Sequence, residues 1–116
     1  MDGGATMKTS YFGNKKINGN SVSIARFPPR GWRGERCIKL APSIDLFKSA
    51  KEGKITWKDF CKRYQSEVLE KLNPKEIYVE LKDKVLCCWE KDSESCHRRL
   101  VAQWIEKALG VTIQEL

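Results

Sequence analysis

The sequence predicts an α/β protein: a small Rossmann-like three-layer fold with a short parallel or mixed sheet. Three observations lead to this prediction. Short β-rich segments open the chain, one apolar run (Lys84–Glu90) is typical of a strand covered on both faces, and amphipathic segments at helical spacing lie on either side of that run. Alternating strands and helices are characteristic of α/β folds. Because 116 residues correspond to one domain, we expect a single α/β domain over residues 7–116, after a flexible N-terminal extension over residues 1–6.

The first half of the chain is expected to form two strands, a loop and two helices. In chain order these are strands at Lys8–Phe12 and Ser21–Phe27, a loop at Arg30–Pro42, and helices at Ile44–Lys51 and Thr56–Leu72. Pro28 and Pro29 end the second strand, because a proline has no backbone N–H to donate to a neighbouring strand. Thr56 is a good N-cap, and Asp59 three residues later completes a capping box for the clearest helix of the chain.

The second half is expected to place helices before and after a buried strand. In chain order these elements are a short helix at Pro74–Leu81, the strand at Lys84–Glu90, a helix at Ser95–Leu109 and an edge strand at Val111–Glu115. Gly110 is positioned to end the last helix in a left-handed conformation. Ser93 or Ser95 is the expected N-cap of that helix.

The composition favours an anionic partner and argues against a membrane span. The formal net charge of +7 favours phosphates, nucleotides or nucleic acid. No apolar run approaches the ~20 residues that cross a bilayer, and the first ten residues lack the apolar stretch of a signal peptide. The five cysteines are an odd number without an export signal, so we expect reduced thiols in a cytoplasmic protein.

One stretch, Cys87–Leu100 (CCWEKDSESCHRRL), gathers three of the cysteines, the only histidine and two arginines. In an α/β sheet, ligands bind beyond the carboxyl ends of strands and near helix N-termini, which is where this stretch is expected to lie. Ser95 and Arg98 are therefore predicted to bind an anion, with Arg98 at the flank of its helix, able to grip a phosphate or carboxylate with two hydrogen bonds.

The same stretch offers residues for catalysis. His97 is a candidate general acid or base that Glu90 would orient, and Cys96 is a candidate nucleophile activated by the helix N-terminus. The alternative is structural: Cys96 is a small buried hydrophobic residue, and His97 bonds Glu90 or a backbone carbonyl.

Arginines from an earlier segment are expected to join this site. Arg26 ends an apolar strand, where an unpaired charge is costly, so we expect it to be paired with Glu90, Asp45 or a bound anion. The loop that follows surrounds Trp32 with basic residues, a pattern suited to phosphate and base contacts or simply to a solvated loop. Its basic residues are Arg30, Arg33, Arg36 and Lys39, of which Arg30 and Arg33 are predicted to bind an anion.

No metal site or cofactor is predicted. On composition alone, zinc ligands could come from Cys37, Cys87, Cys88, Cys96 and His97. However, the chain has no Cys-x-x-Cys pair, and Cys87 and Cys88 point to opposite faces of a strand, so only one of them could join a site.

The segment LCCWEKDSESCHRRLVAQWI resembles the strand–loop–helix signature of the domain-of-unknown-function 488 (DUF488) family, in which Cys-His-Arg opens a helix. TSYFGN and SIARFPP are similar to the first two strands of that family, and the resemblance spans most of Lys8–Ile105. It implies a Rossmann-like core and the location of a site, but no reaction. Two features depart from the family: the acidic residue of an Asp-x-Arg step is missing before Arg26, and the adjacent cysteines occupy positions where aliphatic residues are usual.

The sequence is consistent with three functions. The first is binding of a phosphate-bearing ligand, a nucleotide or nucleic acid, at the Cys-His-Arg helix N-terminus. The second is an enzyme acting on nucleotides or DNA, with His97 as general acid or base and Glu90 as its partner. The third is a non-catalytic adaptor in which the cluster is a structural brace. No membrane partner is expected, and no protein partner is indicated.

Overall fold

The computed structural model describes residues 7–17, 19–90 and 96–116. Within these residues the chain forms one five-stranded sheet in the order β3-β2-β4-β1-β5, and every pair of neighbouring strands is parallel. The strands are β1 (Lys8–Tyr11), β2 (Ser21–Ser23), β3 (Glu35–Arg36), β4 (Val85–Cys88) and β5 (Gln114–Glu115). The α/β class and the parallel sheet are therefore confirmed. The expected flexible extension over residues 1–6 lies outside the described residues.

The helices are α1 (Ile44–Lys51), α2 (Trp57–Glu67), α3 (Pro74–Glu80) and α4 (His97–Leu109). Local sequence signals set most of their ends. Thr56 Oγ1 accepts from the Asp59 N–H while the Asp59 carboxylate accepts from the Thr56 N–H, which is the predicted capping box. Gly110 ends α4 at φ 69°, the left-handed conformation that glycine adopts without steric cost.

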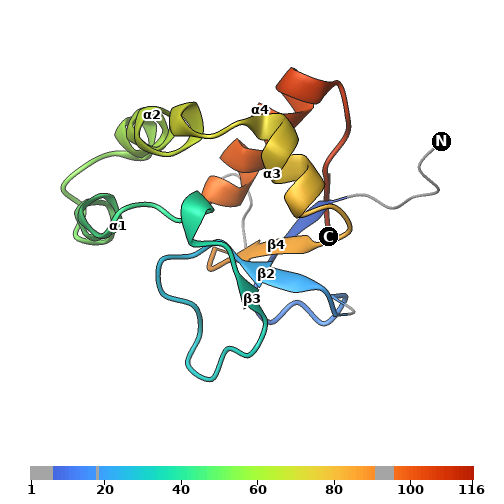
Figure 1. The fold of residues 1–116 in the computed structure, drawn as a ribbon. Helices are drawn as coiled ribbons and strands as arrows, with labels where there is room; N and C mark the ends of the chain where they lie inside the picture. The colour runs from blue at the N-terminus through green and yellow to red at the C-terminus, as the bar shows by residue number, and fades with distance from the viewer. Residues whose placement is uncertain (1–6, 18, 91–95) are drawn as a thin grey trace.

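The hydrophobic core lies between the helices and one face of the sheet (Figure 1). On that face Val22 and Leu86 are register partners, and both belong to the core cluster. On the opposite face the register partners Ser10, Ser23 and Cys87 are buried although they are small or polar. In Figure 1 the four labelled helices lie on the same side of the sheet, while the segment between β2 and β3 loops out on the other side. Among the described residues, no helix covers the second face, where the segment between β2 and β3 lies instead.

The structure corrects several element boundaries. β2 ends at Ser23 rather than Phe27, because the following backbone turns away from the sheet towards α4. The expected loop at Arg30–Pro42 contains β3 and a 3₁₀ turn at Ile38–Leu40. Helix α2 ends at Glu67, and α4 begins at His97 with Cys96 as its N-cap; the expected caps Ser93 and Ser95 lie outside the described residues.

A membrane span is not found: among the described residues, no helix combines the length and the apolar character needed to cross a bilayer.

Candidate functional site: a cleft at the carboxyl edge of the sheet

A cleft of about 930 Å³ lies where β2 and β4 end. Its lining comes from the segment after β2, from α1 and α2, from the residues after β4 and from the start of α4. The lining residues are Ala25, Arg26, Phe27, Pro28, Pro42, Phe47, Ala50, Lys51, Ile55, Thr56, Trp57, Phe60, Trp89, Glu90, Cys96 and His97. Because the carboxyl edge of a parallel sheet is where α/β proteins bind ligands, this cleft is the candidate site.

Aromatic side chains form much of the wall. Phe27, Trp57 and Trp89 are 49%, 40% and 52% exposed, which is unusual for residues of this size. The rings of Phe27 and Phe47 meet edge to face at 5.2 Å, and those of Trp57 and Phe60 stack at 5.1 Å. Exposed aromatic faces around a hollow are suited to bind a flat apolar ring.

Arg26 supplies a fixed positive charge at this wall. Its Nε donates to the Pro42 carbonyl oxygen at 2.9 Å, which holds the guanidinium in place. The expected pairing with Glu90 or Asp45 does not occur: Asp45 bonds Arg63 instead, and no carboxylate of the described residues forms an ion pair with Arg26.

His97 is buried at the inner end of the cleft. Its Nε2 lies 2.7 Å from the Ile24 carbonyl oxygen, and since a carbonyl only accepts, Nε2 carries the proton. Its Nδ1 lies 3.9 Å from Cys96 Sγ. Burial lowers the pKa of His97 to about 4, although the bond to Ile24 raises it, and the charge of Arg98 lowers it further. The imidazole is therefore neutral at physiological pH.

A sulfur pair adjoins His97. The Sγ atoms of Cys88 and Cys96 are joined as a disulfide, whereas the sequence predicted reduced thiols. Cys88, Cys96 and His97 are all buried, and their sulfur and nitrogen atoms lie within 4.8 Å of one another. Cys87 points to the other face of β4, as strand geometry predicted, and burial raises the pKa of its thiol to about 11.

Arg98 does not lie at the flank of α4 as predicted, because it is fully buried. Its Nη2 lies 2.9 Å and its Nε 3.2 Å from Glu115 Oε2, while its Nη1 donates to the Glu90 carbonyl oxygen at 2.5 Å and to Cys88 Sγ at 3.2 Å. These internal contacts tie α4 to β5 and to the end of β4. The carboxylate of Glu115 therefore occupies the place that the sequence analysis gave to a ligand.

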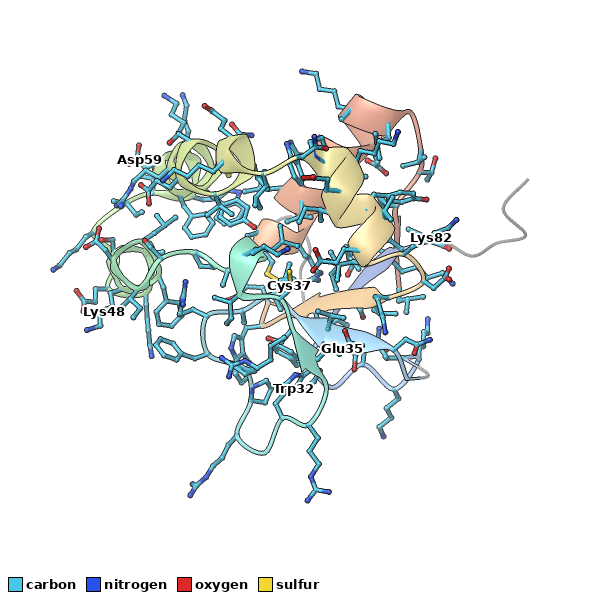
Figure 2. All side chains as sticks on the ribbon, in the orientation of Figure 1. Trp32, Glu35, Cys37, Lys48, Asp59 and Lys82 are labelled. Carbon is cyan, nitrogen blue, oxygen red and sulfur yellow. A yellow bond between two sulfur atoms is a disulfide. The ribbon has the colours of Figure 1, made fainter. Side chains whose placement is uncertain are left out.

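The remaining candidates are dispersed. Glu90 is exposed at the cleft, and the described contacts of His97 do not include its carboxylate. Arg30 and Arg33 are exposed on the segment between β2 and β3, beside Trp32 and outside the cleft lining. Figure 2 shows Trp32 on the side of the sheet away from the helices. Ser95 lies outside the described residues.

The residues of the far wall were not predicted from the sequence. Lys51 and Thr56 line the cleft from the end of α1 and the start of α2, and the exposed Trp57 follows them. The sequence analysis named no candidate site residue in the helix that contains Trp57. The one available signal was the position of Trp57 directly after an N-cap, where a large ring begins the helix at the surface.

Comparison with known proteins places the chain in a family. A family model described as the active DUF488-N3 subclade (DUF488-N3a) matches residues 7–109. The chain belongs to the DUF488 family. No curated protein and no solved structure matches it. The matched range includes every residue that lines the cleft.

Proposed function

We propose that this protein is a cytoplasmic protein that binds a phosphate-bearing ligand, a nucleotide or a segment of nucleic acid, in the cleft at the carboxyl edge of its sheet. The observation that carries the proposal is the combination of an immobilised guanidinium, that of Arg26, with exposed aromatic faces in one hollow of about 930 Å³. A nucleotide presents the complementary pair of groups, an anionic phosphate and a flat base.

The phosphate and the base of the ligand would contact different parts of the cleft. Arg26 uses its Nε on Pro42, and the remaining guanidinium N–H groups are suited to a phosphate, which a guanidinium binds with two hydrogen bonds. Lys51 adds a second positive charge from the end of α1. The base would stack on Trp57 or Trp89, whose exposed rings accept any nucleobase.

The Cys-His-Arg segment supports the cleft in this proposal rather than holding the anion through Arg98. The Arg98–Glu115 pair and the bond between His97 and Ile24 fix the start of α4 against β2, β4 and β5. Arg30 and Arg33 would extend the basic surface for a longer nucleic acid, since they lie outside the cleft lining. Glu90 at the rim would disfavour a second anion there.

The test is equilibrium binding of a fluorescently labelled nucleoside monophosphate and of a labelled single-stranded oligonucleotide. Arg26→Gln and Lys51→Gln should each weaken both ligands about tenfold, as expected for loss of a charged hydrogen bond of about 1.5 kcal/mol or more. Lys82→Gln removes the same charge at the turn before β4, far from α1 (Figure 2), and should leave binding unchanged.

The double variant Arg30→Gln/Arg33→Gln separates free nucleotide from nucleic acid. If nucleic acid is the ligand, this variant binds the oligonucleotide more weakly and with a lower salt dependence, while its affinity for the mononucleotide is unchanged. No salt-sensitive binding of either probe to the wild-type protein, or equal effects of Arg26→Gln and Lys82→Gln, would reject the proposal.

Catalysis at the same site is the second candidate, favoured by the description of the matched subclade as active and by the position of His97 in the cleft. A neutral imidazole at physiological pH can accept a proton, and Glu90 lines the same cleft as His97. His97→Gln should then abolish turnover of a nucleotide substrate while ligand binding survives. Turnover that persists in the His97→Gln variant would exclude His97 as the general acid or base.

A further inference from the structure

We propose that Cys88, Cys96 and His97 form a zinc site when the Cys88–Cys96 disulfide is reduced, with one coordination position directed to the cleft. Two segments bring these residues together: the end of β4, with Cys88, and the start of α4, with Cys96 as the N-cap and His97 as the first helical residue. Their ligand atoms lie within 4.8 Å of one another, and all three side chains are buried. Two thiolates and an imidazole are a set that zinc accepts in catalytic sites.

The histidine is already arranged as a metal ligand. Because Nε2 donates to the Ile24 carbonyl oxygen, the lone pair of the neutral ring is on Nδ1, the nitrogen that faces Cys96 Sγ at 3.9 Å. Metal-binding histidines commonly donate their second N–H to a backbone carbonyl in this way, which fixes the tautomer and the ring orientation. Tetrahedral zinc places a sulfur and a nitrogen ligand about 3.6 Å apart, so a small rotation of either side chain suffices.

The surroundings of the sulfur atoms also favour a metal-bound thiolate. Arg98 Nη1 donates to Cys88 Sγ at 3.2 Å and would stabilise its negative charge. The Cα atoms of Cys88 and Cys96 are 7.0 Å apart. A disulfide usually spans roughly 4.4–6.8 Å between Cα atoms. The sulfur atoms of two thiolates on one zinc ion lie about 3.8 Å apart, which accommodates a wider spacing of the two Cα atoms than a disulfide does.

The fourth position distinguishes this site from a closed structural one. Both Cys96 and His97 line the cleft, so a metal held between them borders the proposed ligand site. Zinc sites with three protein ligands keep their fourth position for water or for a substrate group. Metal binding at this site does not require nucleotide binding, because the metal ligands and the two cationic residues of the cleft are different side chains.

A thiol reductant converts the Cys88–Cys96 disulfide to two thiols. Two equivalents of a monothiol, or one dithiol, supply two electrons and two protons, the Cys88–Cys96 bond breaks, and the reductant leaves as its own disulfide. Zinc then binds the two sulfur atoms as thiolates and releases two protons to solvent.

Cobalt titration of the intact chain tests the site. After reduction and removal of the reductant under anaerobic conditions, Co²⁺ should bind with a stoichiometry of about one per chain and give thiolate charge-transfer absorption and the d–d bands of tetrahedral cobalt. Added Zn²⁺ should displace these bands. The oxidised protein should show neither the charge-transfer absorption nor the d–d bands. Absence of a tetrahedral cobalt spectrum in the reduced protein would overturn the proposal.

The matched variants are Cys88→Ser and Cys87→Ser, which change adjacent buried residues of the same strand that point to opposite faces. Cys88→Ser should abolish the charge-transfer band of one thiolate and weaken cobalt binding at least tenfold, and Cys87→Ser should change neither. Equal losses in both variants would contradict the assignment. Arg26→Gln should retain full metal binding even though it weakens nucleotide binding. Failure of the zinc site is therefore distinguishable from failure of the proposed nucleotide site.

A measurement on the wild-type chain covers the case in which a serine variant fails to fold. With Zn²⁺ present, alkylation of Cys88 and Cys96 in the reduced protein, read by mass spectrometry, should slow at least tenfold. Alkylation of the half-buried Cys61 on α2 should be unchanged. Equal rates at Cys88 and Cys96 with and without zinc would overturn the site.

Discussion

Arg98 is the largest fully buried side chain of the described residues, and its charge is balanced by Glu115 on the edge strand β5. Glu115→Ala should leave this guanidinium buried without a carboxylate, which is costly because a charge away from water needs a partner. We expect a loss of about 3 kcal/mol in the free energy of unfolding, measured by urea denaturation.

The control is Glu80→Ala, which removes the carboxylate of an ion pair with Lys39 in which both side chains are about half exposed. That loss should stay below about 1 kcal/mol, because water screens an exposed pair. Similar effects of the two variants would show that the Arg98–Glu115 pair does not brace α4.

His97 predicts a pH dependence of stability. Its pKa is about 4 in the metal-free fold and about 6.5 in an unfolded chain, so between these values the unfolded state binds more protons. Stability should therefore be fully present above pH 6.5 and fall by up to about 3 kcal/mol as the pH drops towards 4. His97→Gln should flatten this dependence in urea denaturation curves.

The chain has one histidine, so its imidazole gives a single, assignable set of NMR signals. These signals should show a neutral ring protonated on Nε2 throughout the range from pH 6 to pH 8. A titration midpoint near the ordinary value would contradict the burial and the bond to Ile24.

Among the elements, α1 and α2 form the wall of the cleft opposite the strand ends. Trp57 begins α2 and is 40% exposed, so its ring adds little to the core but presents a face to the cleft. Trp57→Leu should weaken nucleotide binding by about 1–3 kcal/mol, the contribution of one base stacked on an aromatic ring. The measurement is binding of the labelled monophosphate.

Val79→Ala is the matched control, because Val79 on α3 is an exposed hydrophobic residue outside the cleft lining. It should leave nucleotide affinity unchanged. If Trp57→Leu binds as tightly as Val79→Ala, the base does not stack on α2.

The start of α2 and the end of α4 were predictable because their sequence signals are local. The capping box of α2 and the left-handed Gly110 depend on residues within one turn of each other. The early end of β2 was not predictable, because the Ile24 carbonyl bonds His97, 73 residues further on. The 3₁₀ turn and β3 within the expected loop are short elements that take their position from Ser23 and the sheet edge.

At the scale of the whole molecule, the location of the site was predictable and its inner contacts were not. Parallel strands bring their carboxyl ends to one edge, so Arg26, Glu90 and His97 were expected to lie together, and all three line the cleft. The partner of Arg98 was not foreseen, because Glu115 lies on an edge strand at the far end of the chain. Lys51 carries no sequence signal that separates it from the other exposed lysines.

The most direct test of the central proposal is a protein NMR titration of the wild-type chain with the four common nucleoside monophosphates. We predict saturable shifts of backbone amide signals confined to the cleft, at the residues after β2 and β4, at the end of α1 and at the start of α2. Signals near Lys82, at the opposite edge of the sheet, should stay unchanged. Shifts that do not saturate, or that spread over basic residues without regard to the cleft, would contradict a phosphate-ligand site there.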